Sequence, residues 1–165
     1  MFSGVRVDRL LLVTALAFAA QDFSTSRQVD LTLTQGTSMS VAASPDRRSI
    51  AIDLLGGIWI LPYRGGEAKR ITPELLEARQ PTWSPDGSRL ALSSDAGGAY
   101  QLHIAAQDGK GDHRVLKPGG AGFYFSPKWS PDNNYIAYYD NSQSVFVMDV
   151  KAGTAKKVAS NKVYT

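Results

Sequence analysis

Residues that could carry acid–base or metal chemistry are few in this chain. Histidine occurs only at His103 and His113, and cysteine is absent. Neither histidine stands in the His-x-His or His-Glu-x-x-His spacing that is typical of zinc sites. Serine, histidine and aspartate are all present, but no Gly-x-Ser-x-Gly elbow identifies a nucleophile. The sequence therefore predicts no catalytic residue, no metal ligand and no cofactor, in a chain that is not an enzyme.

Two short runs that contain glycine could bind ions, and both have a simpler structural interpretation. Gly119–Gly122 is the richest glycine stretch, but it lacks the following helix and the Lys-Ser ending of a phosphate loop, so we interpret it as a connector. Asp108–Asp112 alternates acidic residues with glycine, as calcium loops do, yet it is short, contains Lys110 and lacks further acidic ligands. We interpret this second run as a hairpin loop.

The strongest pattern in the sequence is structural, a Ser-Pro-Asp triplet that recurs at intervals of 40 and 46 residues. The three copies are Ser44-Pro45-Asp46, Ser84-Pro85-Asp86 and Ser130-Pro131-Asp132. Proline presets the backbone for a turn and aspartate accepts backbone N–H groups two residues on, so each copy predicts a turn with a structural role. Trp83 and Trp129 precede two of the triplets, where the first copy has Ala43. This fixed position indicates packing between repeats rather than a ligand platform.

Each triplet is followed by a strand of the same type, and further short β-rich runs complete each unit. The three strands are Ile50-Ala51-Ile52, Leu90-Ala91-Leu92 and Ile136-Ala137-Tyr138. A period of this length made only of short strands is typical of a β-propeller blade. The predicted fold class is all-β, a partial β-propeller of three four-stranded antiparallel blades. We expect the blades at about 38–73, 79–117 and 124–160, with a helical turn at 73–79 as the one helical candidate.

The N-terminus has the order of a secretory signal peptide. Arg6 and Arg9 precede the uncharged run Leu10–Ala20, which is too short to span a bilayer and ends in small residues. We expect a signal peptide over 1–20, cleaved after Ala19 or Ala20, a leader with one strand over 21–37, and a periplasmic or secreted protein. The alternatives are an uncleaved helix or a misassigned start. Cleavage removes two arginines and Asp8, which lowers the net charge from +3 to +2 and predicts no nucleic-acid partner.

The repeat units resemble the propeller repeats of the TolB and tricorn protease families over roughly residues 38–159. Trp83–Asp95 and Trp129–Asp140 are the two best copies, and Val145–Gly153 resembles the end of a tricorn blade. The first unit is more similar to the propeller that precedes some amidohydrolases. The Gly-His and Trp-Asp pair of WD repeats is absent, which excludes that branch. Arg47 and Asn133 replace the turn glycine of the family, which is tolerable if that position needs no positive φ.

The resemblance implies a scaffold, because such relatives carry their hydrolase domains beyond the propeller. Strands alternate in direction, so the Ser-Pro-Asp turns and the hairpins between third and fourth strands share one face of the array. The remaining loops share the other face, and binding residues usually lie on such loops. There Phe123, Tyr124 and Phe125 form the candidate contact loop. The alternative is that these aromatic residues cap the core between blades.

Two functions are compatible with this sequence. The first is an exported, non-catalytic scaffold that binds a protein or peptide, or the missing remainder of its own propeller. The second is the N-terminal fragment of a larger secreted hydrolase, either a tricorn-like serine protease or a propeller-fused amidohydrolase, which the stop soon after the third unit favours. Three blades leave two open faces, so we also expect the isolated chain to dimerise into a six-bladed ring or to be poorly soluble.

Overall fold

The computed structural model describes residues 39–96, 98–110, 114–118 and 122–160. All of them belong to one compact unit, Thr34–Thr165. The predicted signal peptide and leader, residues 1–37, lie outside the described residues, as does His113. Within the described part of the chain, no helix has the length and apolar character needed to cross a bilayer.

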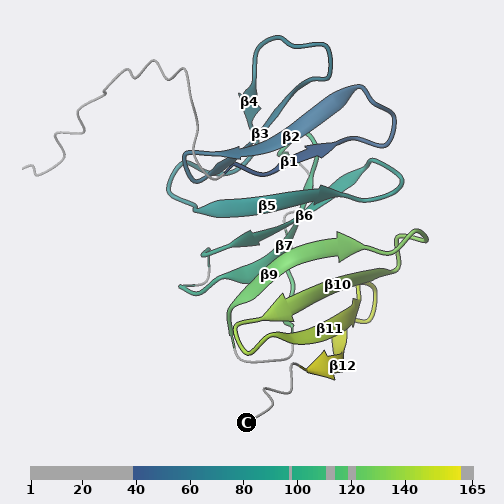
Figure 1. The fold of residues 1–165 in the computed structure, drawn as a ribbon. Helices are drawn as coiled ribbons and strands as arrows, with labels where there is room; N and C mark the ends of the chain where they lie inside the picture. Colours follow the sequence, from purple (N-terminus) through teal and green to yellow (C-terminus); the bar gives the residue numbers. More distant parts are fainter. Residues whose placement is uncertain (1–38, 97, 111–113, 119–121, 161–165) are drawn as a thin grey trace, which may run out of the picture. The chain divides into compact units, whose positions relative to one another are not determined.

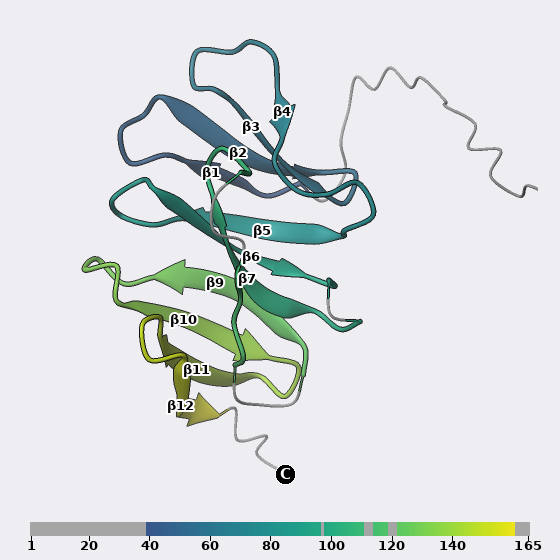
Figure 2. The same cartoon turned by 180° about the vertical axis from the view of Figure 1, so that it is seen from behind.

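The described chain forms twelve strands in three four-stranded antiparallel sheets, which confirms the predicted fold class. In each sheet the strands lie in chain order, and the sheets follow one another in Figures 1 and 2. The first sheet contains β1 (Val41–Ala43), β2 (Ser49–Leu54), β3 (Gly57–Pro62) and β4 (Lys69–Arg70). The second contains β5 (Ala78–Trp83), β6 (Arg89–Ser94), β7 (Gln101–Ala106) and β8 (Arg114–Val115). The third contains β9 (Tyr124–Trp129), β10 (Tyr135–Asp140), β11 (Ser144–Asp149) and β12 (Thr154–Ser160).

The three Ser-Pro-Asp turns, each between the first and second strands of its sheet, have the same pattern of hydrogen bonds. In the middle copy, the Ser84 hydroxyl donates to Asp86 Oδ1 at 2.6 Å and accepts the Arg89 N–H at 3.0 Å, while the Ser88 N–H donates to the same carboxylate oxygen at 2.9 Å. The outer two turns repeat these bonds at the equivalent residues. Each hydrogen bond from serine lowers the pKa of its aspartate below the ordinary value.

The last position of the turn has positive φ in all three copies. The angles are 55° at Arg47, 73° at Gly87 and 62° at Asn133. Arg47 and Asn133 would be tolerable without strain if this position needed no positive φ. The position does have positive φ, so both residues are expected to be strained. Asparagine adopts this conformation more readily than arginine does, so the strain is expected mainly at Arg47.

The sheets pack by placing an alanine against larger side chains of the next sheet. Ala51 of β2 packs with Trp83, Leu90 and Leu92 of the second sheet in one buried cluster. Ala91 of β6 belongs to a second cluster with residues of the third sheet, namely Ile136, Tyr138, Phe146 and Met148. Neighbouring residues of a strand point to opposite faces of the sheet. In each Ile/Leu-Ala sequence the alanine therefore faces forward, toward the C-terminal side of the array, and the larger residues face backward, toward its N-terminal side. This arrangement explains the repeated alanine.

The tryptophans that precede the triplets lie at these junctions, as their repeat position predicts. The Trp83 indole Nε1 donates to the Ala42 carbonyl oxygen of the first sheet at 3.0 Å. Trp129 packs at the edge of the second cluster, and the Arg89 guanidinium lies 5.0 Å from the centroid of its ring. Both tryptophans therefore contact the preceding sheet.

A bulge in the first strand of the second and third sheets makes a further link across each junction. Gln80 and Ser126 occupy equivalent positions with positive φ, and each precedes a buried proline, Pro81 and Pro127. The Gln80 N–H donates to Asp53 Oδ2 at 2.8 Å, and the Ser126 N–H donates to the Gln80 side-chain oxygen, also at 2.8 Å. Each bulge thus uses its unpaired amide to bind a side chain of the preceding sheet.

The connection between the first two sheets differs from the sequence prediction. Residues 73–79 hold no helical turn: a tight turn bonds the Leu76 N–H to the Pro73 carbonyl, and Ala78 and Arg79 already belong to β5. The Arg70 guanidinium donates to carbonyl oxygens of this connection, those of Pro73, Glu74 and Leu76. These side-chain bonds replace the backbone bonds that a helix would have made.

Candidate functional site

The three aromatic residues of the predicted contact loop have different environments. Phe123 is 45% exposed, whereas Tyr124 is 4% exposed and begins β9 together with Phe125. The Tyr124 ring meets Tyr138 edge-on with centroids 5.6 Å apart, and the Tyr124 carbonyl accepts the Ser93 hydroxyl at 2.8 Å. Tyr124 therefore closes the core between the second and third sheets. Phe125 is half-buried, lies 5.6 Å from the Tyr139 ring and faces a pocket.

This pocket, of about 290 Å³, lies between the second and third sheets on the side away from the Ser-Pro-Asp turns. Its walls come from both sheets: Arg79 and Gln80 from β5, Ser93 from the end of β6, Tyr100 from the segment before β7, and Phe125 from β9. Sequence reasoning identified Phe125 but missed Arg79 and Tyr100. The residue types at those two positions do not recur in the other units, so no pattern marked them.

One rim of the pocket is a hydrogen-bonded group formed by Glu77, Arg79 and Tyr100. Arg79 Nε donates to Glu77 Oε1 at 2.8 Å, and its Nη2 donates to the same oxygen. The hydrogen bond from Arg79, and then that from Tyr100, lowers the pKa of the Glu77 carboxyl. Burial, followed by the hydrogen bond to Glu77, raises the pKa of the Tyr100 phenol. Glu77 therefore stays ionised and Tyr100 stays protonated near neutral pH, which fixes both side chains at the rim.

The polar groups deeper in the pocket already bind the protein. The Gln80 side-chain oxygen accepts the Ser126 N–H, and the Ser93 hydroxyl donates to the Tyr124 carbonyl. Ser93 therefore has a backbone carbonyl where a nucleophilic serine would have a base. The pocket offers two aromatic rings and a guanidinium on a preorganised frame, groups that can pack against a side chain and donate hydrogen bonds to it.

The residues considered for metal or ion binding do not gather at this pocket. His103 is fully buried in the centre of β7. Asp108 Oδ1 accepts the Lys110 N–H at 2.9 Å in a turn that the Gly109 N–H closes onto the Ala106 carbonyl, as in a hairpin loop, whereas Gly111 and Asp112 of that run lie outside the described residues. Over the ranges that the structure describes, no group of three or more His, Cys, Asp or Glu residues could hold a metal ion. Gly119–Ala121 lies outside those ranges.

The repeated four-stranded sheet, entered by a Ser-Pro-Asp turn and joined to its neighbour by tryptophan and bulge contacts, defines a β-propeller blade. Comparison with family models gives the particular type: residues 16–163 match the TolB beta propeller domain. Because that match includes most of the sequence, this chain belongs to the TolB beta propeller domain family.

Individual relatives agree with this assignment. The chain is 31% identical over 93 residues to Tricorn protease homolog 1 of Streptomyces coelicolor, and 33% identical over 78 residues to Tol-Pal system protein TolB of Chromobacterium violaceum. These matches cover 56% and 46% of this chain but 9% and 18% of the relatives. The crystal structure of TolB from Acinetobacter baumannii superposes with a TM-score of 0.64 at 23% identity, over 87% of this chain and 37% of that one. The chain therefore spans less than half of the length of each of these three proteins.

Proposed function

We propose that this chain is an exported, non-catalytic β-propeller segment that binds a protein or peptide at the pocket between its second and third sheets. The observation that carries the proposal is the pairing of Tyr100 and Phe125 with Arg79 at one opening. Tyrosine, phenylalanine and arginine are enriched where proteins bind partners, and tyrosine and arginine dominate the binding energy. Export to the periplasm or to the medium is proposed from the order of charged, apolar and small residues between Arg6 and Ala20.

The partner class follows from the dimensions and the chemistry of the pocket. A volume of about 290 Å³ is at the lower end for small-molecule sites, and it suits one apolar side chain of a peptide lying across the junction. The Arg79 guanidinium, although paired with Glu77, keeps donors for a peptide carbonyl at the rim. The small net charge of +3 argues against a nucleic-acid partner. Further propeller blades would be a partner of the same chemical class.

The test is selection of peptides from a displayed random library on the immobilised full chain, followed by affinity measurement for the enriched sequences. Loss of the Phe125 ring in Phe125→Ala should weaken binding by about tenfold or more, as expected for an aromatic anchor. Tyr100→Ala removes the other aromatic ring of the pocket and should also weaken binding. Tyr63→Ala, which removes a 48% exposed aromatic side chain of the first sheet, is the matched control and should bind normally. Failure to enrich any peptide, or equal affinity for all three variants, would contradict the proposal.

A second candidate function is the propeller part of a larger secreted hydrolase, either a tricorn-like serine protease or a propeller-fused amidohydrolase. The observation in its favour is the relative named Tricorn protease homolog 1, of which the match covers 9%. The test is the coding sequence downstream of Thr165 in the source genome. In-frame codons for further Ser-Pro-Asp units and a catalytic domain would establish this function, and an immediate stop codon would reject it.

A further inference from the structure

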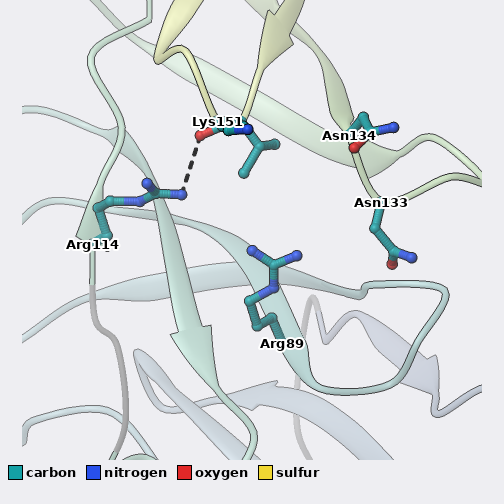
Figure 3. A pocket seen from close by; sticks show the side chains of 6 residues that line it. Arg89, Arg114, Asn133, Asn134 and Lys151 are labelled. Atoms are coloured by element: carbon teal, nitrogen blue, oxygen red, sulfur yellow. Dashed lines mark hydrogen bonds between the residues drawn. The ribbon is translucent and has the colours of Figure 1, made fainter.

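A second pocket lies between the same two sheets but at the end that carries the Ser-Pro-Asp turns. Arg89 begins β6 and lines this pocket, whereas Ser93, near the end of β6, lines the first, so the two pockets open at opposite ends of one strand. The second pocket has a volume of about 350 Å³. Figure 3 shows its lining, which consists of Arg89, Arg114, Asn133, Asn134, Val150 and Lys151.

Three cationic side chains and no carboxylate are among the described residues that line this pocket. Arg114 Nη2 donates to the Val150 carbonyl at 3.3 Å, and its Nε is buried without a hydrogen-bond partner. Arg89 lies over the Trp129 ring, a contact that leaves the guanidinium edge with its donors available. The two ion pairs found among the described residues are elsewhere, at Arg48–Asp46 and Arg79–Glu77.

Two acidic residues that adjoin the lining residues in the sequence, Asp132 and Asp149, have backbone or turn partners. Asp132 accepts hydrogen bonds from Ser130 and from Asn134. Asp149 Oδ1 accepts the backbone N–H groups of Lys151 and Ala152 at 2.9 and 2.8 Å. The Asn133 side-chain oxygen accepts the Asp86 N–H at 3.1 Å, which leaves its amide N–H groups as donors. The described lining of the pocket therefore consists mainly of cationic and amide donors and includes no acidic side chain.

We propose that this second pocket binds the carboxylate side chain of an acidic segment in a partner peptide. Guanidinium groups match carboxylates in shape and form paired, charge-assisted hydrogen bonds with them, and the partly buried position of Arg89 and Arg114 strengthens such bonds. Three cations confined to one pocket suit a single acidic side chain rather than a polyanion, which would require an extended basic face. The inference rests on the proposed function only in that the partner is a peptide.

The experiment uses the full chain and a fluorescent peptide, acetylated and amidated at its ends, with three consecutive glutamates in a Gly/Ser background. A peptide with glutamine in place of glutamate is the matched probe. Fluorescence anisotropy should show binding of the glutamate peptide at least about tenfold tighter than that of the glutamine peptide. The difference should shrink when the salt concentration rises to about 0.5 M, because ions screen the attraction.

Three variants assign that binding to the pocket. Lys151→Gln and Arg114→Gln should each weaken binding of the glutamate peptide by about five- to tenfold. Arg48→Gln removes the same charge from an exposed turn of the first sheet and should leave the affinity unchanged. If Arg114→Gln fails to fold because its bond to Val150 is lost, Lys151→Gln, whose side chain is exposed, decides the question.

Three results would overturn the proposal. They are equal affinity for the two peptides, equal effects of Lys151→Gln and Arg48→Gln, and displacement of the glutamate peptide by an equal concentration of inorganic phosphate, which would assign the pocket to phosphate. Binding of the peptides selected at the Tyr100–Phe125 pocket is measured as well, because it distinguishes a failure of this proposal from a failure of the proposed function. Their unchanged binding in the same preparation would show that the first pocket works and that only the second assignment is wrong.

Discussion

The middle sheet and the two outer sheets have closely similar second strands but different burial. In β6 every residue after Arg89 is buried, whereas buried residues alternate with more exposed ones in β2 and β10. The sequences do not account for this contrast, because all three strands contain the Ile/Leu-Ala pair. The middle sheet has a neighbour on each face, and each outer sheet contacts one described neighbour. Burial in this architecture is therefore a property of the junction rather than of the sheet.

The largest expected effect concerns the two outer faces, which no described sheet covers. The first sheet presents Ile50, Ile52 and Trp59 on its outer face, and the third presents Tyr135 and Val147, by alternation from the residues in the two clusters. Covering a few hundred Å² of such surface is worth on the order of 5–10 kcal/mol per face. We expect the isolated 165-residue chain to associate into a dimer as its concentration rises, or otherwise to aggregate.

Light scattering over a concentration series measures this association. Val147→Lys, which places a charge on the outer face of the third sheet, should shift the midpoint of association to higher concentration. A chain that unfolds cooperatively as a monomer at micromolar concentration would contradict the prediction, because it would show that the uncovered faces carry no penalty.

The second prediction compares equivalent residues on a covered and an uncovered face. Leu92 is fully buried against the first sheet, and Ile52 occupies the same repeat position on the outer face of that sheet. Leu92→Ala should lower the free energy of unfolding by about 2–5 kcal/mol, because it leaves a cavity at a junction. Ile52→Ala should cost about 1 kcal/mol or less. Urea unfolding under conditions that keep the chain monomeric gives both values, and equal losses would refute the role assigned to the junction.

The two junctions also differ in the polar group that joins them. Asp53 accepts the Ser40 backbone N–H at 2.6 Å, the Ser40 hydroxyl and the Gln80 N–H, whereas Ser93, at the same repeat position, makes one bond to the Tyr124 carbonyl. Asp53→Asn replaces one acceptor oxygen by an NH₂ group and should cost about 1.5–3 kcal/mol, because the bonds lost are to a charged group. Ser93→Ala should cost about 1 kcal/mol. Chemical unfolding of both variants tests the order, and the reverse order would show that Asp53 does not hold the first junction.

A smaller effect is expected from the strained turns. Arg47→Gly should raise the free energy of unfolding by about 0.5–1 kcal/mol, because glycine adopts the observed φ of 55° without a penalty from Cβ. Asn133→Gly should gain less, because it removes the acceptor of the Asp86 N–H between the second and third sheets. Thermal unfolding of the two variants side by side measures the difference. A larger gain at position 133 would show that the hydrogen bond across the junction contributes nothing.

The smallest effect is a pH dependence that the three turns should not share equally. The Ser84 hydroxyl lowers the pKa of Asp86, so this group adds stability above the unfolded value of about 3.9, and that contribution disappears as the pH falls through the lower folded pKa. Asp46 and Asp132 are exposed, so screening by solvent should leave their contribution too small to measure. Ser84→Ala should reduce the loss of stability between about pH 5 and 3. An unchanged pH profile in this variant would exclude Asp86 as its source.

Much of the fold could be predicted from the sequence because its determinants are local. The Ser-Pro-Asp turns and the Ile/Leu-Ala strands that follow them predicted three units of four strands, which agrees with the twelve strands observed. The bulges at Gln80 and Ser126 were missed, although the following prolines, Pro81 and Pro127, share one offset from their triplets.

The candidate site was less accessible to sequence reasoning. Phe125 is separated from Arg79 and Tyr100 by 46 and 25 residues, and only the packing of two sheets brings the three together. Tyr124 and Phe125 are neighbours with opposite environments, because successive residues of a strand face opposite sides. A short aromatic run therefore could not show by itself which of its rings faces solvent.

The forward direction of each alanine has a consequence for how such a gene can evolve. At both described junctions the earlier sheet contributes an alanine and the later sheet contributes larger residues, so the two junctions follow the same packing rule. A recombination event that copies the segment from one Ser-Pro-Asp turn to the next would insert a sheet whose two faces already fit its new neighbours. In-frame duplication or deletion of such a DNA segment would thus keep the apolar part of each contact, whereas the polar bonds at Asp53 and Ser93 would still have to be matched.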